Sequence, residues 1–396
     1  MSGMILVLNA GSSSVKCALI ETNGHGHDHE TARGSVDGLG QDARFRFSFS
    51  DGRPNLQLPI AGSKAATHKD AIELVLKTID DHFGLSRLIA AGHRVVHGGD
   101  EFRAPVILES HALAALKKLI PLAPLHQPHN LSAIDAVGAL APHLPQIACF
   151  DTAFHATIPA VARNFALPKA LTEKGIRRYG FHGISFSYIA QHLRETEPEL
   201  AHKDVVIAHL GNGASLCALK GGHSVATTMG FSALDGLMMG TRCGTIDPAV
   251  IFYLMRDENM SAEAVETMLY GQSGLLGVSG LSNDMRALRQ AAADHADARL
   301  AIAMFTYRII REIGSMAAAL GGLDGIVFTA GIGEHDSELR EDVLNGLGFL
   351  GFSVDRKANA RHDRVISASS SNPALVIPTN EEAMIARSTA KLITPV

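Results

Sequence analysis

The chain repeats one local pattern three times: an apolar run of β-forming residues ends in a turn of small and polar residues, glycine above all. The three segments are 5–20, 205–220 and 325–341. The first two continue into a second apolar run and predict hairpins, whereas the third continues into a polar stretch that is typical of a helix. A glycine-rich turn at the end of a strand exposes backbone N–H groups that can hold phosphate oxygens. The pattern therefore favours a mixed fold with anion-binding turns.

Helical patterns separate these segments along the chain. They lie at 68–83, 110–120, 185–200, 261–270, 297–320 and 337–347. A further strand is expected at 146–155. Because strands alternate with helices, the expected fold class is α/β. A length of 396 residues suits two domains better than one, and we place the boundary between them near Asp151.

A short echo relates the two predicted hairpins. Residues 14–19 read S-V-K-C-A-L and residues 215–219 read S-L-C-A-L. Short apolar matches recur by chance, yet both copies follow the same kind of turn. The echo therefore hints at duplicated domains.

Composition excludes several classes of protein. Hydrophobic residues make up 46% of the chain and charged residues 19%, which indicates packed domains and not a disordered chain. The net charge is −5 and no basic block interleaves with aromatic residues, so nucleic acid is not an expected partner. The first apolar run is too short for a signal peptide, and no run is long enough to span a membrane. With four widely spaced cysteines, we expect a cytoplasmic protein without a membrane partner.

The chain lacks the P-loop, the dinucleotide-binding G-x-G-x-x-G, the zincin H-E-x-x-H and the hydrolase G-x-S-x-G motifs. What remains is a set of polar residues within glycine-rich segments. Arg94 and Arg242 each lie among glycine and apolar residues, where a solvated arginine would be unusual. A guanidinium binds carboxylate or phosphate through a planar fork. Two such forks suggest an anionic substrate, with a structural ion pair as the alternative for each.

Other polar residues add to this set. His182 stands at a turn that opens a predicted helix, where a neutral imidazole can meet negative charge. Glu381 and Glu382 follow an apolar run, where a carboxylate could hold Mg²⁺ through water or could simply begin a helix. The segment His25–Glu30 carries metal-capable side chains, but its glycine and asparagine neighbours favour a solvated turn. Phosphate turns, paired arginines and a carboxylate together indicate metal-assisted phosphoryl transfer.

These motifs resemble those of the acetate and propionate kinase family, within the actin, sugar-kinase and heat-shock ATPase superfamily. The stretches L-N-A-G-S-S-S-V-K and G-H-R-V-V-H-G-G resemble its two signatures, and seven more motifs follow in family order. The resembling segments are 8–16, 92–99, 150–155, 178–183, 209–215, 240–248, 282–286, 328–334 and 378–382. The resemblance spans nearly the whole chain, from residue 4 to about residue 390.

The resemblance implies an α/β fold of two duplicated actin-like (ribonuclease H-like) domains with a nucleotide cleft between them. The first domain would cover 1–151, with a C-terminal helix at about 383–396 packing back on it. The second domain would cover 152–382, bind the nucleotide and form a homodimer.

The resemblance also implies roles for individual residues. The catalytic set contains Asp151, His182, Arg242, Arg94 and His126. Its arginines would bind acetate and the transferring phosphoryl group, and its histidines would stabilise the transition state. The pocket for the substrate's methyl group would contain Val96, Leu125 and Phe181 beside Arg94. Nucleotide binding would involve Lys16, His209, Gly211, Asn212, Gly213, Asp284, Met285, Arg286, Gly331, Ile332 and Gly333. Asn9 and Glu381 would hold the metal, with Asp151 beside them.

The implied reaction is reversible phosphoryl transfer from ATP to acetate, dependent on Mg²⁺ or Mn²⁺ and giving acetyl phosphate and ADP. Because a metaphosphate-like transition state needs fixed cations and donors and little covalent chemistry, direct in-line transfer is expected. A propionate or butyrate kinase is the alternative enzyme, and a nucleotide-switched binding protein is the alternative from another class. Ala233 stands where the family commonly has proline, and His335 where asparagine is common. Because of the alanine at position 233, the volume of the substrate pocket is an open question. The histidine at position 335 concerns only the rim of the nucleotide site.

Overall fold

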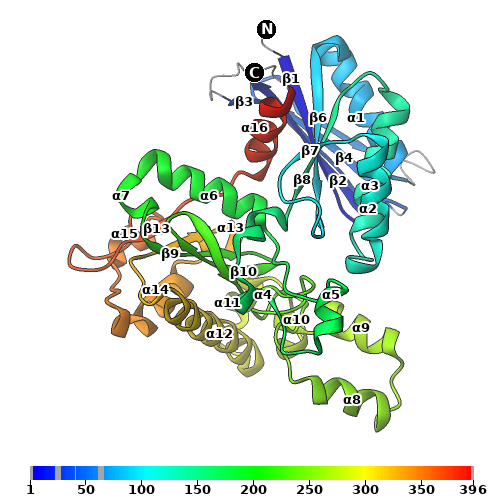
Figure 1. Ribbon diagram of the computed structural model, residues 1–396. Helices are drawn as coiled ribbons and strands as arrows, with labels where there is room; N and C mark the ends of the chain where they lie inside the picture. Colours follow the sequence, from blue (N-terminus) through cyan, green and yellow to red (C-terminus); the bar gives the residue numbers. More distant parts are fainter. Residues whose placement is uncertain (1–2, 23–27, 41, 61–66, 394–396) are drawn as a thin grey trace. The chain divides into compact units, whose positions relative to one another are not determined.

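The two predicted hairpins begin two separate β-sheets. The structure is a computed structural model that describes residues 3–22, 28–40, 42–60 and 67–393. The chain divides into two compact units, 1–154 with 380–396 and 155–379. Each unit carries one sheet with helices packed against it (Figure 1). Residues 25–27 of the histidine-rich segment lie outside the described residues.

The first unit contains an eight-stranded sheet. Its strands are β1 (Gly3–Ala10), β2 (Ser14–Thr22), β3 (Asp28–Asp37), β4 (Arg44–Phe49), β5 (Leu56–Pro59), β6 (Leu88–Val95), β7 (Val106–Ile107) and β8 (Gln146–Phe150). Its helices are α1 (His68–Phe83), α2 (Ser110–Lys118), α3 (Gln127–Leu140) and α16 (Glu381–Ile393). The order across the sheet is β5-β4-β3-β2-β1-β6-β8-β7.

The second unit contains a five-stranded sheet of order β11-β10-β9-β12-β13. Its strands are β9 (Asp204–Leu210), β10 (Ala214–Lys220), β11 (His223–Thr227), β12 (Gly325–Thr329) and β13 (Ala374–Val376). The helices before β9 are α4 (Ala160–Arg163), α5 (Lys169–Glu173), α6 (Gly183–Thr196) and α7 (Pro198–Ala201). The later helices are α8 (Pro248–Arg256), α9 (Ala262–Gly271), α10 (Gly274–Ser279), α11 (Met285–Ala291), α12 (Ala296–Leu320), α13 (Ala330–His335), α14 (Ser337–Gly346) and α15 (Arg356–Ala360).

Five neighbouring strands of the first sheet, β3-β2-β1-β6-β8, repeat the topology of the second sheet. In the first unit β1 pairs antiparallel with β2 and β2 with β3, whereas β1, β6 and β8 run parallel. In the second unit β9 pairs antiparallel with β10 and β10 with β11, whereas β9, β12 and β13 run parallel. The sequence echo falls on β2 and β10, which occupy the same place in this pattern. The echo therefore marks equivalent strands of two duplicated folds.

Alternating apolar side chains bury one face of the first sheet. Leu6 and Leu8 of β1 belong to a core with Ile72 and Val75 of α1 and Val137 of α3. Each fully buried aliphatic side chain of this kind stabilises the fold by about 1.5–3 kcal/mol. The opposite face of the sheet packs against α16, so the last helix returns to the first unit (Figure 1).

Local signals explain where several elements begin and end. Helix α1 starts at the predicted residue because Thr67 and Asp70 form a reciprocal capping box. Proline at position 198 ends the helix predicted for 185–200, which becomes α6 and the short α7. The strand predicted for 146–155 is also too long, because β8 ends at Phe150 and residues Ala153–Thr157 form a 3₁₀ turn.

Candidate active site

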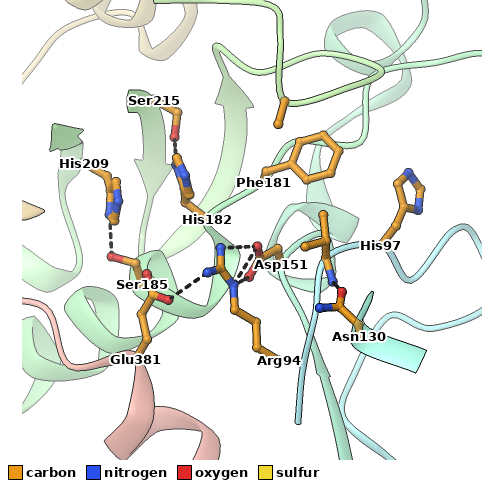
Figure 2. Close-up of polar contacts among 12 residues, drawn as sticks. Arg94, His97, Asn130, Asp151, Phe181, His182, Ser185, His209, Ser215 and Glu381 are labelled. Carbon is orange, nitrogen blue, oxygen red and sulfur yellow. Dashed lines mark hydrogen bonds and ion pairs between the residues drawn. The ribbon is translucent and has the colours of Figure 1, made fainter. Parts of the chain in front are cut away.

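Arg94 and Asp151 form a bidentate ion pair at one edge of the first sheet. Arg94 lies near the end of β6, and Asp151 follows its parallel neighbour β8. Because parallel strands bring their carboxyl ends to the same edge, the two side chains meet there. Nε of Arg94 lies 3.1 Å from both carboxylate oxygens, and Nη2 lies 2.7 Å from Oδ2 (Figure 2). Asp151 is 2% exposed, so it holds the guanidinium plane in one orientation.

Helix α16 brings a second carboxylate to the same arginine. Oε2 of Glu381 lies 3.9 Å from Nη1 of Arg94. This approach depends on Gly92 in β6, where an added Cβ would lie 2.5 Å from Oγ1 of Thr389 and 2.7 Å from a methyl carbon of Ile385. A side chain at position 92 would therefore push α16 away from the sheet, and Glu381 with it.

Glu381 belongs to a cluster in which carboxylates outnumber cationic groups. Burial raises the pKa of the Glu381 carboxyl, the positive charges of Arg94 and Lys16 oppose this rise, and the nearby carboxylates of Asp151 and Glu382 add to it. A divalent cation placed here would favour the charged form of the carboxylate. The oxygen donors and the surplus charge thus fit the way Mg²⁺ is bound, through one or two carboxylates together with water and substrate phosphates.

Asn9 and Lys16 lie on the sheet face that α16 covers. Leu8 and Ala10, the neighbours of Asn9, point into the core with α1 and α3, so Asn9 points to the opposite face. Lys16 is the direct partner of Asn9 across β1 and β2 and shares that face. The predicted metal residues Asn9 and Glu381 therefore share one side of the first unit.

Asn130 in α3 is a residue that the sequence analysis missed. Its side-chain oxygen accepts a hydrogen bond from the N–H of Val96 at 3.0 Å, and its nitrogen donates to the carbonyl of Ala10 at 2.8 Å. It is 3% exposed. Asn130 thus ties the end of β1, where the first glycine-rich turn begins, to the residues that follow Arg94. Its only signal in the sequence is a polar residue within an apolar helix.

The predicted methyl-pocket residues differ in exposure. Val96 is 9% exposed and Leu125 is 46% exposed. His126 occupies the N-cap position of α3 without a capping hydrogen bond from its side chain, and it is half-buried. In the second unit Phe181 is 2% exposed, and its carbonyl accepts a hydrogen bond from His155 at 2.9 Å. A joint role for these residues stays a prediction.

Two histidines stack in the second unit. The rings of His182 and His209 lie 4.2 Å apart between centroids, with an interplanar angle of 23°. Nδ1 of His182 lies 2.9 Å from the hydroxyl of Ser215, and Nδ1 of His209 lies 2.9 Å from that of Ser185 (Figure 2). His182 precedes α6 in the left-handed conformation, with φ of 58°. Such a backbone costs a non-glycine residue about 1–3 kcal/mol and is enriched at functional sites.

The loop that carries Arg242 lies against the second glycine-rich turn. The N–H of Gly240 donates to the carbonyl of Asn212 at 3.0 Å, and an added Cβ on Gly240 would overlap the Asn212 side chain. Nη1 of Arg242 donates to the carbonyl of Ala233 at 3.0 Å. A Cβ built on Gly213 would lie 3.2 Å from Nε2 of His182 and 3.9 Å from Nη1 of Arg242. The turn, the histidine and the arginine are therefore neighbours within one unit.

A pocket of about 580 Å³ opens beside the same turn. Its lining combines the second turn, the start of α11 and the third glycine-rich segment. It includes Gly211, Asn212, Asp284, Met285, Arg286, Gly331, Ile332, His335 and Asp336. Seven of these nine residues are ones that the resemblance implies for nucleotide binding. The Asp284 carboxylate also caps α11, accepting hydrogen bonds from the N–H groups of Arg286 and Ala287.

Four residues implied for nucleotide binding do not line this pocket, and one of them, Gly213, belongs to the second glycine-rich turn described above. Gly333 is buried against β9, His209 stacks on His182, and Lys16 belongs to the first unit. The carbonyl of Gly333 accepts a hydrogen bond at 2.9 Å from Arg340, a fully buried arginine that the sequence analysis missed. Nη1 of Arg340 also donates to the carbonyl of Glu334 at 2.8 Å. Arg340 therefore secures the segment behind the pocket wall.

The described residues contain no group of three or more His, Cys, Asp and Glu side chains that could hold a metal ion. Within the same described part of the chain, no helix is long and apolar enough to cross a membrane.

Comparisons with known proteins identify the family. The model of the acetokinase family matches residues 4–387. The chain belongs to the acetokinase family. An acetate kinase of Rhodopseudomonas palustris is 51% identical over 394 residues, covering 98% of both chains. An acetate kinase of Clostridium botulinum is 43% identical over 399 residues, covering 98% of this chain and 99% of its own.

Solved structures agree with this family membership. The acetate kinase of Porphyromonas gingivalis has a TM-score of 0.91 at 37% identity, covering 99% of this chain and 100% of its own. A propionate kinase of Francisella tularensis has a TM-score of 0.92 at 38% identity, covering 98% of both chains. The predicted family, the α/β fold class of that family and the prediction of an ATP-dependent carboxylate kinase are thereby confirmed.

Proposed function

We propose that this member of the acetokinase family is an acetate kinase, which transfers the γ-phosphoryl group of ATP to acetate reversibly and directly. One observation carries the proposal: the wall of the 580 Å³ pocket ends at Asn212, and the next residue, Gly213, faces His182 and Arg242. A nucleotide in the pocket would therefore direct its phosphates toward a guanidinium and an imidazole. Fixed donors aimed at developing charge are the main source of catalysis in phosphoryl transfer.

Arg94 is suited to bind the acetate carboxylate. A guanidinium has five N–H groups, and Asp151 engages only those of Nε and Nη2. The N–H groups of Nη1 point toward the Glu381 side, at 3.9 Å. Asp151 thus orients the arginine, while Nη1 remains available for a small anion. No protein nucleophile is needed, because the acetate oxygen itself attacks the phosphorus.

Asn9 and Glu381 are proposed to hold Mg²⁺ or Mn²⁺ together with the nucleotide, with Asp151 beside them. Their oxygens lie on one side of the first unit, where the carboxylates of Glu381, Asp151 and Glu382 outnumber the cationic Arg94 and Lys16. A bound divalent ion would neutralise charge on the phosphate oxygens. Few protein ligands are needed at such a metal site, because substrate phosphates and water would complete the coordination of the ion.

Acetate is expected to exceed propionate in kcat/KM by about 10-fold or more, because a tight apolar pocket discriminates a methylene by roughly 1–3 kcal/mol. Val96→Ala should move this ratio toward propionate by removing two methyl groups. The Val96 backbone should stay in place, because its N–H is bonded to Asn130. Steady-state rates with both acids, for wild type and variant, measure the ratio.

A propionate kinase is the second candidate, and two observations favour it. The Francisella propionate kinase has a TM-score of 0.92 with this chain. Ala233, where the resemblance expects proline, contributes the carbonyl that binds Arg242, and a smaller side chain there could enlarge the substrate pocket. Equal kcat/KM values for acetate and propionate in the wild type would move the assignment to a propionate kinase or a generalist.

Helix α8 supports the proposal of a homodimer. It buries none of its residues, and Phe252 and Tyr253 are 58% and 51% exposed. Apolar side chains around most of a helix mark an interaction surface. We assign a second copy of the chain to it, because identical apolar helices complement each other across a twofold axis.

Replacing Phe252 and Tyr253 together with glutamate should convert the dimer into a monomer. Each aromatic side chain contributes about 1.5–3 kcal/mol when buried, and two opposed carboxylates would repel. Sedimentation velocity measures the mass, and Phe349→Glu, at a residue 76% exposed outside α8, is the control. A wild-type monomer, or a double variant that remains dimeric, would contradict the assignment.

A further inference from the structure

The hydroxyl groups of Ser185 and Thr379 form a row of hydrogen bonds that ends at His209. Oγ of Ser185 lies 2.9 Å from Nδ1 of His209 and 2.8 Å from Oγ1 of Thr379. Ser185 is fully buried in the first turn of α6, and His209 is 8% exposed. We call Ser185 and Thr379 the hydroxyl pair. Its members are 194 positions apart in the chain, and both lie in the second unit.

The proton count of this row couples the hydroxyl pair to the tautomer of His209. A serine hydroxyl has one proton to donate, and Ser185 has a hydrogen-bonding neighbour on each side. If Thr379 donates to Ser185, then Ser185 donates to Nδ1 of His209, and the histidine carries its proton on Nε2. If Nδ1 of His209 is the donor, both hydroxyls turn the other way. Loss of the Thr379 hydroxyl removes one of the two groups that fix the direction of the Ser185 O–H bond.

The ring of His209 in turn supports His182. The two rings stack at 4.2 Å, so two positive charges there would repel strongly. Nδ1 of His182 is held by Ser215, which is fully buried. Ser215 therefore constrains one ring nitrogen of His182, and His209 constrains one face of the ring. The other nitrogen, Nε2, faces Gly213 of the second glycine-rich turn. A shift of His209 would loosen the contact between the two ring faces.

Thr379 also touches the nucleotide side of the unit. Its backbone N–H donates to Oε1 of Glu334 at 3.2 Å. Glu334 belongs to α13, whose residues Gly331 and Ile332 line the 580 Å³ pocket. One residue thus connects the wall of the nucleotide pocket, through its N–H, with the stacked histidines, through its hydroxyl. Substitution of the Thr379 side chain can remove the hydroxyl contact with Ser185 and keep the N–H contact with Glu334.

We infer that Ser185 and Thr379 are positioning residues for phosphoryl transfer, which hold His209 and, through its stacked ring, set the orientation of His182. The inference rests on the proposed role of His182 in transition-state stabilisation. Ser185 is fully buried and contacts His209, so the effect of the pair should fall on kcat and spare substrate binding. It should also act as one unit, because each hydroxyl needs the other to fix the direction of the row.

Four variants test the inference on the full-length protein. Thr379→Val removes the hydroxyl at nearly constant volume and keeps the N–H to Glu334, Thr379→Ser keeps the hydroxyl, and Ser185→Ala removes the link to His209. Thr306→Val is the matched control, because that hydroxyl bonds only the carbonyl of Ile302 within α12 in the described contacts. Acetate-dependent ADP formation provides kcat and both KM values.

Thr379→Val and Ser185→Ala should each lower kcat by about 3- to 10-fold, the size of one net hydrogen bond, with both KM values within about twofold of wild type. Thr379→Ser should restore kcat, the double variant should be no worse than Ser185→Ala, and Thr306→Val should match wild type. Wild-type kcat in both single variants would overturn the inference. A loss in Thr379→Ser equal to that in Thr379→Val, or a loss confined to KM, would overturn it as well.

Imidazole ¹⁵N spectra of histidine-labelled protein without substrate give a readout that does not need activity. The Nδ1 and Nε2 resonances of His209, assigned with His209→Gln, should change tautomer population in Thr379→Val and Ser185→Ala and stay unchanged in Thr306→Val. Identical His209 spectra in all variants would overturn the coupling. A wild-type protein without acetate-dependent turnover would refute the proposed function instead, while these spectra would still test the hydroxyl pair.

Discussion

Arg242→Ala is expected to lower kcat by about 100-fold or more, because loss of one preorganised donor to developing charge costs about 3–4 kcal/mol. The guanidinium is held beside Gly213 and His182 by the carbonyl of Ala233. That contact lies within one loop region, so the fold should survive the substitution. Single-turnover rates with saturating ATP and acetate measure the chemical step directly.

Arg242→Lys is the matched variant for this prediction. It keeps the positive charge but loses the planar fork, so its rate should lie between those of alanine and wild type. Near wild-type turnover of Arg242→Ala would remove Arg242 from the catalytic set. Arg94 is a less clean target, because removal of one partner of its buried pair with Asp151 would cost about 3–5 kcal/mol of folding free energy.

Glu381→Ala is expected to raise the Mg²⁺ concentration needed for half-maximal turnover by about 10-fold or more, because a weakly coordinated Mg²⁺ depends on one or two carboxylates. The thermal unfolding midpoint should change little, since burial opposes the charge of the Glu381 carboxylate and its contact with Arg94 is long, at 3.9 Å. Initial rates over a Mg²⁺ titration at a constant total ATP concentration, together with a thermal melt, provide both quantities.

Glu382→Ala controls for the loss of a charge at the same helix end. Glu382 borders a different pocket, of about 330 Å³, on the first sheet, and its removal should leave the Mg²⁺ requirement near that of wild type. A Glu381→Ala enzyme with the magnesium dependence of the wild type would show that this carboxylate serves only the first turn of α16.

Local signals in the sequence predicted most elements of the fold. The hairpins at 5–20 and 205–220 were predictable because each apolar run ends in a glycine-rich turn, and they form β1–β2 and β9–β10. The echo after these turns correctly hinted at duplication, because equivalent strands retained similar residues. Boundaries were less accurate, since the end of β8 depends on the 3₁₀ turn that follows it.

Contacts between distant segments were beyond the reach of sequence patterns. Ser185 and Thr379 are ordinary residues in two separate motifs, and only the folded second unit joins them. Arg340 looks like a surface residue of a polar helix, yet its five hydrogen bonds are all buried or partly buried. Asn130 likewise acquires its role from two backbone groups that lie 34 and 120 positions away.

The residues of the candidate site were predicted mainly from motifs that resemble those of the family, and less from physical arguments about single residues. Arginines among glycines indicated an anion site, but their assignment to acetate and phosphoryl groups came from the resemblance. The structure adds a reason for two of the glycines: Gly92 lets α16 approach β6, and Gly240 lets its loop approach Asn212. The structure also shows that Gly333 does not line the nucleotide pocket, because that residue packs on β9.

The most direct test of the account is the formation of acetyl phosphate by the purified full-length chain. Purified protein with MgATP should produce ADP and hydroxylamine-trappable acetyl phosphate in equal amounts when acetate is added, and little ADP without it. A nucleotide-switched binding protein would hydrolyse ATP at a rate independent of acetate. ADP production that is unaffected by acetate, propionate or butyrate would contradict the assignment of a short-chain carboxylate kinase.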